Sequence, residues 1–393
     1  MPKDKYIEEV INPGDEASRL ARKVCVESFS NSGAVEVIHG SKRGEFRNAD
    51  DFRWKRHILE GMLEGEYAET IQNDGAGGKT NFTALKGTRT AYKQAGWETI
   101  AMNADDIVRD GGLPVIMTNE LNAKRITAKN FHLFTAFMNG YTRALRVTRM
   151  LNFTGETAVM KYSITTPFNV KDEKTLIFTL GGTCVGLTHR SKKINPGSIM
   201  PSMYIVGLVD PGYRCNGGTK LTDIALTGSN FTGYEAFIKD TTIPSKCYAP
   251  LITKVHGWKK DGRVMDPVVK IAGIAHITGG GLWEKLGEIL PTGVGAKLDK
   301  MVNAPVVLLM AEYLSRPKLP ALTAYSIFHG GCGMIVICYT EKDANTLVYM
   351  AGRMGYQARV IGITTRSEKN EILVRSGFMD RNKQTISSLE LEE

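Results

Sequence analysis

The stretch Ala275-His276-Ile277-Thr278-Gly279-Gly280-Gly281-Leu282-Trp283-Glu284-Lys285-Leu286 joins an apolar approach to a helix start through a histidine, a hydroxyl and three glycines. Glycines allow the backbone to pass close to a ligand. A helix that begins near Leu282 directs its free N–H groups and the positive end of its dipole back at the loop. The stretch therefore predicts an anion-binding corner with His276 beside it as a titratable group. A structural glycine turn capped by Thr278 is the alternative interpretation.

The rest of the chain alternates strand-like and helix-like segments. Residues 334–339 form a continuous apolar run, which is typical of a strand buried on both faces. Thr340 then caps a predicted helix, and residues 358–362 return as a strand. This predicted β-α-β unit, together with the alternation elsewhere, indicates an α/β or α+β fold.

Composition and charge agree with a globular enzyme. The chain has 393 residues, which favours two or three domains, and 50 basic against 41 acidic residues give a net charge of +9. A basic balance suits phosphorylated substrates, nucleic acid or simple solubility. The basic residues are scattered, and short clusters such as residues 190–193 lack interleaved aromatic side chains. We therefore expect no nucleic-acid partner.

The cysteine pattern and the N-terminus bear on the compartment. The six cysteines include no CxxC pair, which is typical of free thiols in a reducing compartment. Cys215 and Cys332 lie in motif loops where either could be a nucleophile, and a small packing residue is the favoured alternative. The N-terminus has no apolar signal core, and no apolar run reaches the ~18 residues of a membrane helix. We therefore expect a cytoplasmic protein without a membrane partner.

A domain boundary is predicted at residues 192–201, which contain two prolines and several polar residues. The expected organisation is an N-terminal domain over residues 1–191, a C-terminal α/β domain over residues 192–380 and a polar tail over residues 381–393.

Several further motifs surround the opening stretch in a defined order. They are Asn73-Asp74-Gly75-Ala76-Gly77-Gly78-Lys79, Ala101-Met102-Asn103-Ala104-Asp105-Asp106-Ile107-Val108, Gly155-Glu156-Thr157-Ala158, Asn216-Gly217, Ala249-Pro250 and Phe328-His329-Gly330-Gly331-Cys332-Gly333-Met334. The ordered set resembles the phosphoribosylformylglycinamidine cyclo-ligase (aminoimidazole ribonucleotide synthetase) family of purine biosynthesis. The resemblance covers roughly residues 70 to 365, and the chain looks like a divergent member.

The resemblance implies a fold and an activity. It implies two α/β domains, of which the N-terminal one binds ATP and pairs across a homodimer. It also implies ATP-dependent ring closure of a small sugar-phosphate substrate, with Mg²⁺ as a cofactor and phosphorylation of a formamide oxygen as the first step. Two alternatives stay open: another ATP-using relative, such as a small-molecule kinase or synthetase, and a dimeric nucleotide-binding homologue without catalysis.

The loop from Asp74 to Lys79 is the first candidate site. Carboxylate oxygens suit Mg²⁺, which keeps several waters and bridges phosphates. Lys79 supplies a point charge for phosphate oxygens and is a candidate catalytic residue. Under the resemblance, Gly75 and Gly77 contact the nucleotide. An Asp-Gly turn followed by a surface lysine is the structural alternative.

Three further acidic positions are candidates for the same ATP–Mg²⁺ site. Adjacent residues cannot both face one site on a regular helix, so only one of Asp105 and Asp106 is expected to be a ligand. The matching family position favours Asp106, with a helix cap as the alternative. The resemblance adds Glu98 as a metal ligand and Glu156 as a nucleotide contact.

The C-terminal candidates are His276, Arg214, Asn216 and the loop Gly279, Gly280 and Gly281. By resemblance, the glycine loop and Asn216 bind phosphate, and His276 handles a proton or stabilises the intermediate. The family commonly has His-Ser-Asn-Gly where this chain has Arg214-Cys215-Asn216-Gly217. Arginine binds phosphate bidentately but stays protonated, so Arg214 is predicted to be catalytic without being a general base. His329, in the altered late motif, is a possible replacement histidine.

Overall fold

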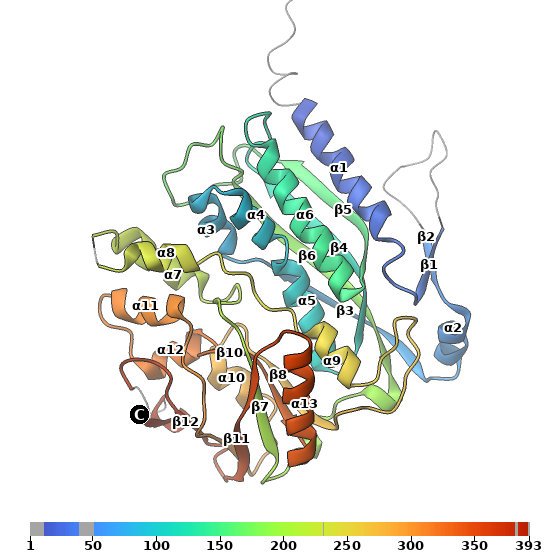
Figure 1. Ribbon diagram of the computed structural model, residues 1–393, viewed down its shortest axis with the longest axis vertical. Helices are drawn as coiled ribbons and strands as arrows, with labels where there is room; N and C mark the ends of the chain where they lie inside the picture. The colour runs from blue at the N-terminus through green and yellow to red at the C-terminus, as the bar shows by residue number, and fades with distance from the viewer. Residues whose placement is uncertain (1–11, 39–50, 231, 382–383, 392–393) are drawn as a thin grey trace, which may run out of the picture. The chain divides into compact units, whose positions relative to one another are not determined.

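The computed structural model describes residues 12–38, 51–230, 232–381 and 384–391 (Figure 1). The chain forms two compact units. The first contains residues up to Ile107, together with Gly112–Ser191 and Lys259–Val264, and the second contains Val108–Gly111, Lys192–Trp258 and the residues from Met265 onward. Both units combine helices with a sheet, so the predicted α/β (α+β) class is confirmed.

The first unit is built on a four-stranded sheet in the order β3-β6-β4-β5. Strands β3 and β4 run antiparallel to β6, and β5 runs parallel to β4. A separate two-stranded sheet pairs β1 with β2. The elements are α1 (Asn12–Ser28), β1 (Val35–Ile38), β2 (Asp51–Trp54), α2 (Arg56–Leu63), β3 (Tyr67–Gly75), α3 (Lys79–Lys86), α4 (Arg89–Ala95), α5 (Glu98–Arg109), β4 (Leu113–Ala123), α6 (Phe131–Thr148), β5 (Leu151–Val159) and β6 (Phe178–His189).

Two glycines allow α4 and α6 to approach closely, and this approach positions the start of α5. A Cβ on Gly140 would lie 1.9 Å from the carbonyl oxygen of Lys93, and a Cβ on Gly96 would lie 2.5 Å from the backbone nitrogen of Tyr141. Any larger residue at either position would force the two helices apart. Gly96 also follows the last residue of α4, so α5 begins two residues later at Glu98.

The second unit is built on a seven-stranded sheet in the order β13-β12-β9-β11-β7-β10-β8. All neighbouring strands are antiparallel except β12 and β9. The elements are β7 (Tyr204–Val209), α7 (Gly218–Thr227), α8 (Tyr234–Asp240), α9 (Ala249–Val255), β8 (Ile271–His276), α10 (Gly281–Gly287), β9 (Val294–Leu298), α11 (Val306–Leu314), α12 (Ala321–Ile327), β10 (Cys332–Cys338), α13 (Glu341–Arg353), β11 (Ala358–Arg366), β12 (Ile372–Arg375) and β13 (Thr385–Ser387), with short 3₁₀ turns at Arg190–Lys192, Pro196–Ser198 and Ser388–Leu391.

The predicted β-α-β unit is present, with one difference. Strand β10, helix α13 and strand β11 form in the predicted order, and the Thr340 hydroxyl accepts a hydrogen bond from the Asp343 backbone N–H at 3.1 Å as the predicted cap. However, β7 lies between the two strands and is antiparallel to both. Part of the predicted polar tail also takes a defined place, because Thr385–Ser387 pairs with β12 at the edge of this sheet.

Candidate functional site

Lys79 and Glu98 form a buried ion pair inside the first unit. The Lys79 Nζ lies 3.0 Å from Glu98 Oε1, and the two side chains are only 2% and 1% exposed. Lys79 is the first residue of α3 and Glu98 is the first residue of α5, so the pair joins the starts of two helices. A carboxylate at the first turn of α5 also interacts favourably with the helix dipole. Both residues were predicted site residues, and the structure brings them together.

Asp74 lies at the end of β3, where α5 contacts the strand. The Asp74 Oδ1 accepts a hydrogen bond from the Gly75 backbone N–H at 2.7 Å, and the Asn103 side-chain amide donates to the Asp74 backbone oxygen at 3.1 Å. Two buried oxygens beside this contact, Thr99 Oγ1 and Asn103 Oδ1, have no hydrogen-bond partner among the described residues. Because buried polar atoms are normally hydrogen bonded, this place suits a polar ligand or an ordered water.

Asp105 and Asp106 follow Asn103 on the same helix and differ in exposure. Asp105 is fully buried, whereas Asp106 is half-buried. Asp106 is therefore the more accessible carboxylate of the pair, as the family position favours.

The two predicted nucleotide-contacting glycines lie beside Asp74. Gly75 lies at the end of β3, and Gly77, in the loop that precedes α3, has a positive φ of 51°, which suits glycine.

Glu156 lies far from Asp74 within the sheet. In the strand register, Glu156 on β5 is paired with Glu120 on β4, Glu120 with Gly181 on β6, and Gly181 with Gly75 on β3. These four residues form one row across the sheet. Strands β3 and β5 are separated by β6 and β4, which corresponds to about 14 Å at the usual strand spacing. Asp74 also belongs to the neighbouring row, and neighbouring rows direct side chains to opposite faces. The structure therefore does not place Glu156 with Asp74 in one cluster.

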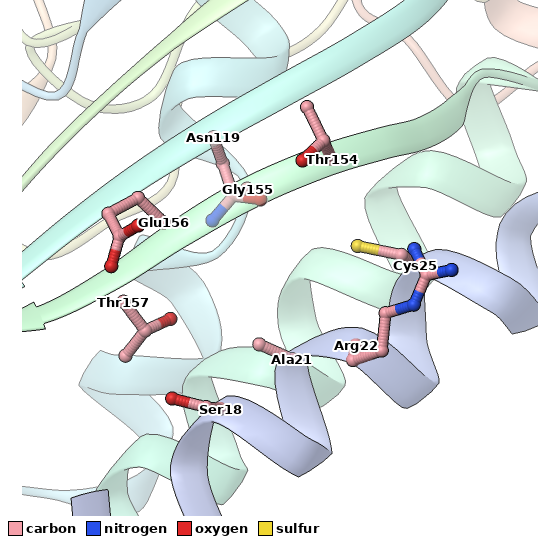
Figure 2. Close-up of a pocket in the computed structure, with 9 residues that line it drawn as sticks. All are labelled: Ser18, Ala21, Arg22, Cys25, Asn119, Thr154, Gly155, Glu156 and Thr157. Atoms are coloured by element: carbon pink, nitrogen blue, oxygen red, sulfur yellow. The ribbon is translucent and has the colours of Figure 1, made fainter. Parts of the chain in front are cut away.

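Two pockets of the first unit include Glu156. A pocket of about 490 Å³ is lined by β3, β6, β4 and β5, and its members are Asn73, Thr118, Asn119, Glu120, Thr154, Gly155, Glu156, Gly181, Gly182 and Thr183. Its volume falls in the range of small-molecule sites. A smaller pocket of about 80 Å³ lies between α1 and β5, where Arg22 and Cys25 face the strand (Figure 2). Glu156 is exposed and contributes to both.

The acidic side chains of the first unit can be compared with the ligands that Mg²⁺ requires. Over the described parts of the chain, no group of three or more His, Cys, Asp or Glu side chains is arranged to hold a metal ion. A nucleotide-bound Mg²⁺ needs only one or two protein carboxylates, because phosphates and waters complete its shell. The half-buried carboxylates of Asp74 and Asp106 fit that requirement. Glu98 fits it poorly, because its carboxylate is buried against Lys79.

In the second unit, Asp210, Arg214 and His276 form a buried chain of contacts. The Arg214 Nη1 donates to Asp210 Oδ2 at 2.9 Å, and the Arg214 Nη2 lies 2.6 Å from His276 Nε2. All three side chains are at most 1% exposed. The Arg214 guanidinium carbon also lies 5.1 Å from the centre of the Tyr248 ring, a cation–π geometry. Sequence reasoning identified Arg214 and His276 but missed Asp210, although it directly follows an apolar strand and precedes Pro211-Gly212.

Glycine at position 333 makes room for this arginine. A Cβ there would lie 2.5 Å from Arg214 Cδ, 2.8 Å from the Tyr248 hydroxyl and 3.0 Å from Asp210 Cβ. Gly333 belongs to β10, the strand next to β8 that carries His276. The glycine in the late motif is therefore explained by close packing against the guanidinium.

The loop from Arg214 to Gly217 has an unusual backbone. Arg214 and Cys215 have positive φ angles of 51° and 63°, and Gly217 follows at 77°. For non-glycine residues the left-handed region costs roughly 1–2 kcal/mol each, and such strain concentrates at functional sites. The Asn216 Oδ1 lies 3.6 Å from the position of a Cβ on Gly279, so two predicted phosphate-binding residues face each other.

The glycine triplet itself has a clear packing role. Gly280 and Gly281 have φ angles of 86° and 66°, and a Cβ on Gly281 would lie 2.2 Å from the Tyr325 backbone oxygen. Helix α10 begins at Gly281 with no side-chain cap, so the Thr278 hydroxyl does not cap it. The positive φ angles of the turn favour glycine at both positions, and contact with α12 further requires glycine at position 281, whether or not the loop binds phosphate.

The suggested replacement histidine, His329, is buried and bonded to the backbone of two loops. Its Nδ1 accepts a hydrogen bond from the Gly331 backbone N–H at 3.0 Å, and its Nε2 lies 2.9 Å from the Gly212 backbone oxygen. Both ring nitrogens therefore have backbone partners, and the side chain is 2% exposed. The histidine joins the loop after β7 to the loop before β10.

Burial lowers the reactivity expected of the cysteine thiols. All six are buried, and burial raises the pKa of both Cys184 and Cys332 to about 12. A thiol with such a pKa is almost entirely protonated near neutral pH and is a poor nucleophile. Burial therefore favours the packing role for Cys332, and Cys215 is 6% exposed in the strained loop.

Comparison with known families matches both halves of the chain. Residues 56–188 match the family described as AIR synthase related protein, N-terminal domain, and residues 262–375 match AIR synthase related protein, C-terminal domain. The chain belongs to the AIR synthase-related family. This AIR synthase-related chain is 26% identical, over 79% of its own length and 87% of the relative, to phosphoribosylformylglycinamidine cyclo-ligase of Pseudothermotoga lettingae.

Solved structures place this AIR synthase-related protein in a wider fold group. Thiamine-monophosphate kinase of Stenotrophomonas maltophilia is similar with a TM-score of 0.53 and 14% identity, covering 89% of this chain and 92% of the kinase. The E. coli hydrogenase maturation protein HypE is similar with a TM-score of 0.51 and 13% identity, covering 94% of this chain and 96% of HypE. These likenesses establish the fold. No helix in the described ranges is long and apolar enough to cross a membrane.

Proposed function

We propose that this protein closes the imidazole ring of aminoimidazole ribonucleotide, using formylglycinamidine ribonucleotide and ATP and releasing ADP and phosphate. The observation that carries the proposal is the extent of similarity to a curated cyclo-ligase, which covers 79% of this chain and 87% of that enzyme. Both the N-terminal and the C-terminal family domains match in order. The protein would act in the cytoplasm on a small sugar-phosphate substrate.

The proposed reaction has two steps. The γ-phosphoryl group of ATP is transferred to the formamide oxygen of the substrate, which leaves ADP. A nitrogen of the same molecule then attacks the formyl carbon and releases its proton to water. The bond from that carbon to the phosphorylated oxygen breaks, and inorganic phosphate departs with the oxygen. Positioning and neutralisation of charge dominate such phosphoryl transfers.

The residues divide between nucleotide and substrate handling. Asp74 and Asp106 would hold Mg²⁺, which when bound would neutralise charge on the phosphates. Asn103 and Thr99 would satisfy their buried oxygens beside Asp74 with a polar group or water. In the second unit, Asn216 and Gly279 would contact a phosphate, and Arg214 would orient His276.

We propose a homodimer that forms through the four-stranded sheet of the first unit. Helix α1 packs against α6 and β5, and α6 also packs against α4, while Ile71 on β3 is 67% exposed. The family resemblance carries this proposal, because it implies that the N-terminal domains pair across a homodimer. Mass measured by sedimentation equilibrium should equal two chains, and a single-chain mass at micromolar concentration would reject the dimer.

The experiment measures ADP and imidazole product in the same tube, with purified protein, Mg²⁺, ATP and formylglycinamidine ribonucleotide. Equal amounts of ADP and product support the cyclo-ligase. Asp74→Asn should raise the KM for ATP without loss of fold, whereas Asp172→Asn, at an ion pair with Lys124 on the surface of the same unit, serves as the matched control. ATP hydrolysis without product would reject the proposed substrate.

A second candidate is a nucleotide-binding homologue without this chemistry, and the burial of Lys79 favours it. The Lys79 ammonium is 2% exposed and is paired with Glu98, so its charge is already neutralised inside the protein. Under this candidate, ATP binds to the purified protein, and neither ADP nor imidazole product forms. Calorimetric titration with ATP alongside the turnover assay separates the two functions.

A further inference from the structure

The carboxylate of Asp210 is fixed by three donors in the interior of the second unit. Its Oδ2 accepts from Arg214 Nη1 at 2.9 Å and from the Lys246 backbone N–H at 3.0 Å, and its Oδ1 accepts from the Gly212 backbone N–H at 3.0 Å. Asp210 and Arg214 are both 0% exposed. A carboxylate held by three donors cannot rotate without breaking several hydrogen bonds, so it presents a fixed anionic partner to the guanidinium.

The guanidinium of Arg214 is equally constrained. Besides contacting Asp210, its Nη1 donates to the Lys246 backbone oxygen, and the guanidinium carbon lies over the Tyr248 ring at 5.1 Å from the ring centre. Gly333 leaves room for the side chain where any Cβ would collide with it. The other terminal nitrogen, Nη2, lies 2.6 Å from Nε2 of the His276 ring.

This contact determines which nitrogen of His276 carries the proton. A guanidinium has only donors and no acceptor, and it stays protonated in proteins. The His276 Nε2 must therefore accept the hydrogen bond through its lone pair. A neutral imidazole has one donor and one acceptor nitrogen, so the ring proton lies on Nδ1.

We infer that Asp210 and Arg214 are positioning residues that hold His276 as the neutral Nδ1–H tautomer, so that His276 acts as a hydrogen-bond donor through Nδ1 and not as a base through Nε2. The role of His276 in the reaction, as a donor and not a base, rests on the proposed function. The Nε2 lone pair is engaged by Arg214 and cannot remove a proton from the attacking nitrogen. A donor at Nδ1 suits the negative charge that develops on the transferred phosphoryl group or on the departing phosphate.

This arrangement explains how arginine, in place of the usual family histidine at position 214, affects the hydrogen bond to His276. A histidine at position 214 could donate or accept toward His276, because either tautomer is available to it. An arginine can only donate, so it removes that ambiguity. The divergence at Arg214 then changes the role of His276 from a candidate base to a donor.

The first test is independent of any substrate. Full-length protein labelled with ¹⁵N-histidine is examined by ¹H–¹⁵N correlation of the imidazole rings, and the signals of His276 among the seven histidines are assigned by their loss in His276→Gln. The expected spectrum has a protonated Nδ1 and an unprotonated Nε2 at His276. A protonated Nε2 in the wild-type protein would overturn the inference, and this measurement needs no variant other than the one used for assignment.

The second test removes the positioning pair. In Arg214→Met the ring should shift toward the Nε2–H tautomer. In Asp210→Asn the guanidinium is still a donor but is no longer held by a charged partner, so the Nδ1–H tautomer should be less populated than in the wild-type protein and more populated than in Arg214→Met. Asp380→Asn, at the surface pair with Lys318 in the same unit, should leave the His276 signals unchanged. Unchanged His276 signals in a folded Arg214→Met protein would show that the arginine does not set the tautomer.

A kinetic comparison tests the consequence for the reaction. The amide nitrogen of asparagine falls near the position of Nδ1, and that of glutamine falls near Nε2. His276→Asn should therefore retain more kcat than His276→Gln, by roughly 100-fold if the donor acts in the transition state. Equal kcat values or the reverse order would reject the donor role. If the wild-type protein forms no product, the proposed function fails, and the tautomer experiment still decides the positioning role.

Discussion

Arg214 Nη2 lies 2.6 Å from His276 Nε2, a contact between two side chains that belong to motifs 62 residues apart in the sequence. On its other side, the guanidinium is held by the buried carboxylate of Asp210. The three residues lie on the loop after β7 and at the end of β8, two strands of one sheet that are separated only by β10. The divergent arginine is therefore integrated into the core of the second unit.

Asp210→Asn is expected to destabilise the protein strongly. The substitution removes the charge that compensates Arg214, and breaking a fully buried ion pair from one side costs about 3–5 kcal/mol. Urea unfolding followed by circular dichroism should show this loss in the free energy of unfolding. The exposed pair of Lys318 and Asp380 provides the control, because Asp380→Asn should cost less than about 1 kcal/mol. Similar losses in both variants would contradict the role assigned to Asp210.

Gly333→Ala is expected to displace the guanidinium of Arg214. The new Cβ would lie 2.5 Å from Arg214 Cδ in a region with no room for adjustment, and such overpacking typically costs about 1–3 kcal/mol. Thermal unfolding and steady-state turnover should both decline. Gly352→Ala on α13 is the matched control, since a Cβ there meets nothing within 4 Å and alanine favours a helix. A stable and fully active Gly333→Ala protein would show that the arginine can be moved without consequence.

The pair of Lys79 and Glu98 can be separated into structural and functional parts by a double-mutant cycle. Lys79→Met and Glu98→Leu should each cost about 3–5 kcal/mol, because each leaves one buried charge without its partner. The double variant should recover much of that loss, as two apolar side chains can replace a buried ion pair. If Lys79 binds phosphate, the double variant should be folded but should bind ATP weakly. Full ATP affinity in the double variant would restrict Lys79 to a structural role.

Much of the second unit could be predicted from sequence because its signals are local. The apolar run at residues 334–339, the cap at Thr340 and the return strand from residue 358 each depend on neighbouring residues alone. The insertion of β7 between β10 and β11 could not be predicted, because pairing of distant strands depends on the whole sheet.

The candidate site of the first unit was harder to predict for the same reason. Asp74 and Glu156 both belong to sequence motifs of the family. Only the strand order β3-β6-β4-β5 reveals that three strand spacings separate their strands. The burial of Lys79 depends on Glu98, which reaches it from another helix. Residue type and motif spacing do not contain that information. Asp210, by contrast, had a usable signal, a carboxylate directly after an apolar strand and four residues before an arginine.

Native protein is expected to resist thiol reagents. Burial raises the pKa of Cys184 and Cys332 to about 12, so a thiol reagent at pH 8 meets almost no thiolate at either position. Reaction with a chromogenic disulfide should be slow in the native state and should reach six thiols per chain after unfolding in guanidinium. Cys332→Ala should lose about 1 kcal/mol or more of stability from the lost sulfur contacts while keeping its kcat. Rapid native labelling at Cys332, or loss of turnover in a folded Cys332→Ala protein, would restore it as a candidate nucleophile.

Acidification should destabilise the second unit through His256. Burial lowers the pKa of His256 below its ordinary value near 6.5, and the nearby Lys192 lowers it further, although the hydrogen bond to the Lys192 backbone oxygen at 2.7 Å opposes this shift. Between the folded-state pKa and the unfolded-state pKa near 6.5, the unfolded chain binds a proton at His256 more readily than the folded protein does. The stability that is present above about pH 6.5 is therefore lost as the pH falls through the lower folded-state pKa. Unfolding free energies measured between about pH 7.5 and 5 should decline less steeply in His256→Gln, whose amide can still donate to the Lys192 oxygen without titrating. His132→Gln, on the exposed surface of α6, provides the reference for removing a histidine. Parallel curves for the wild-type and His256→Gln proteins would show that His256 makes no contribution to acid sensitivity.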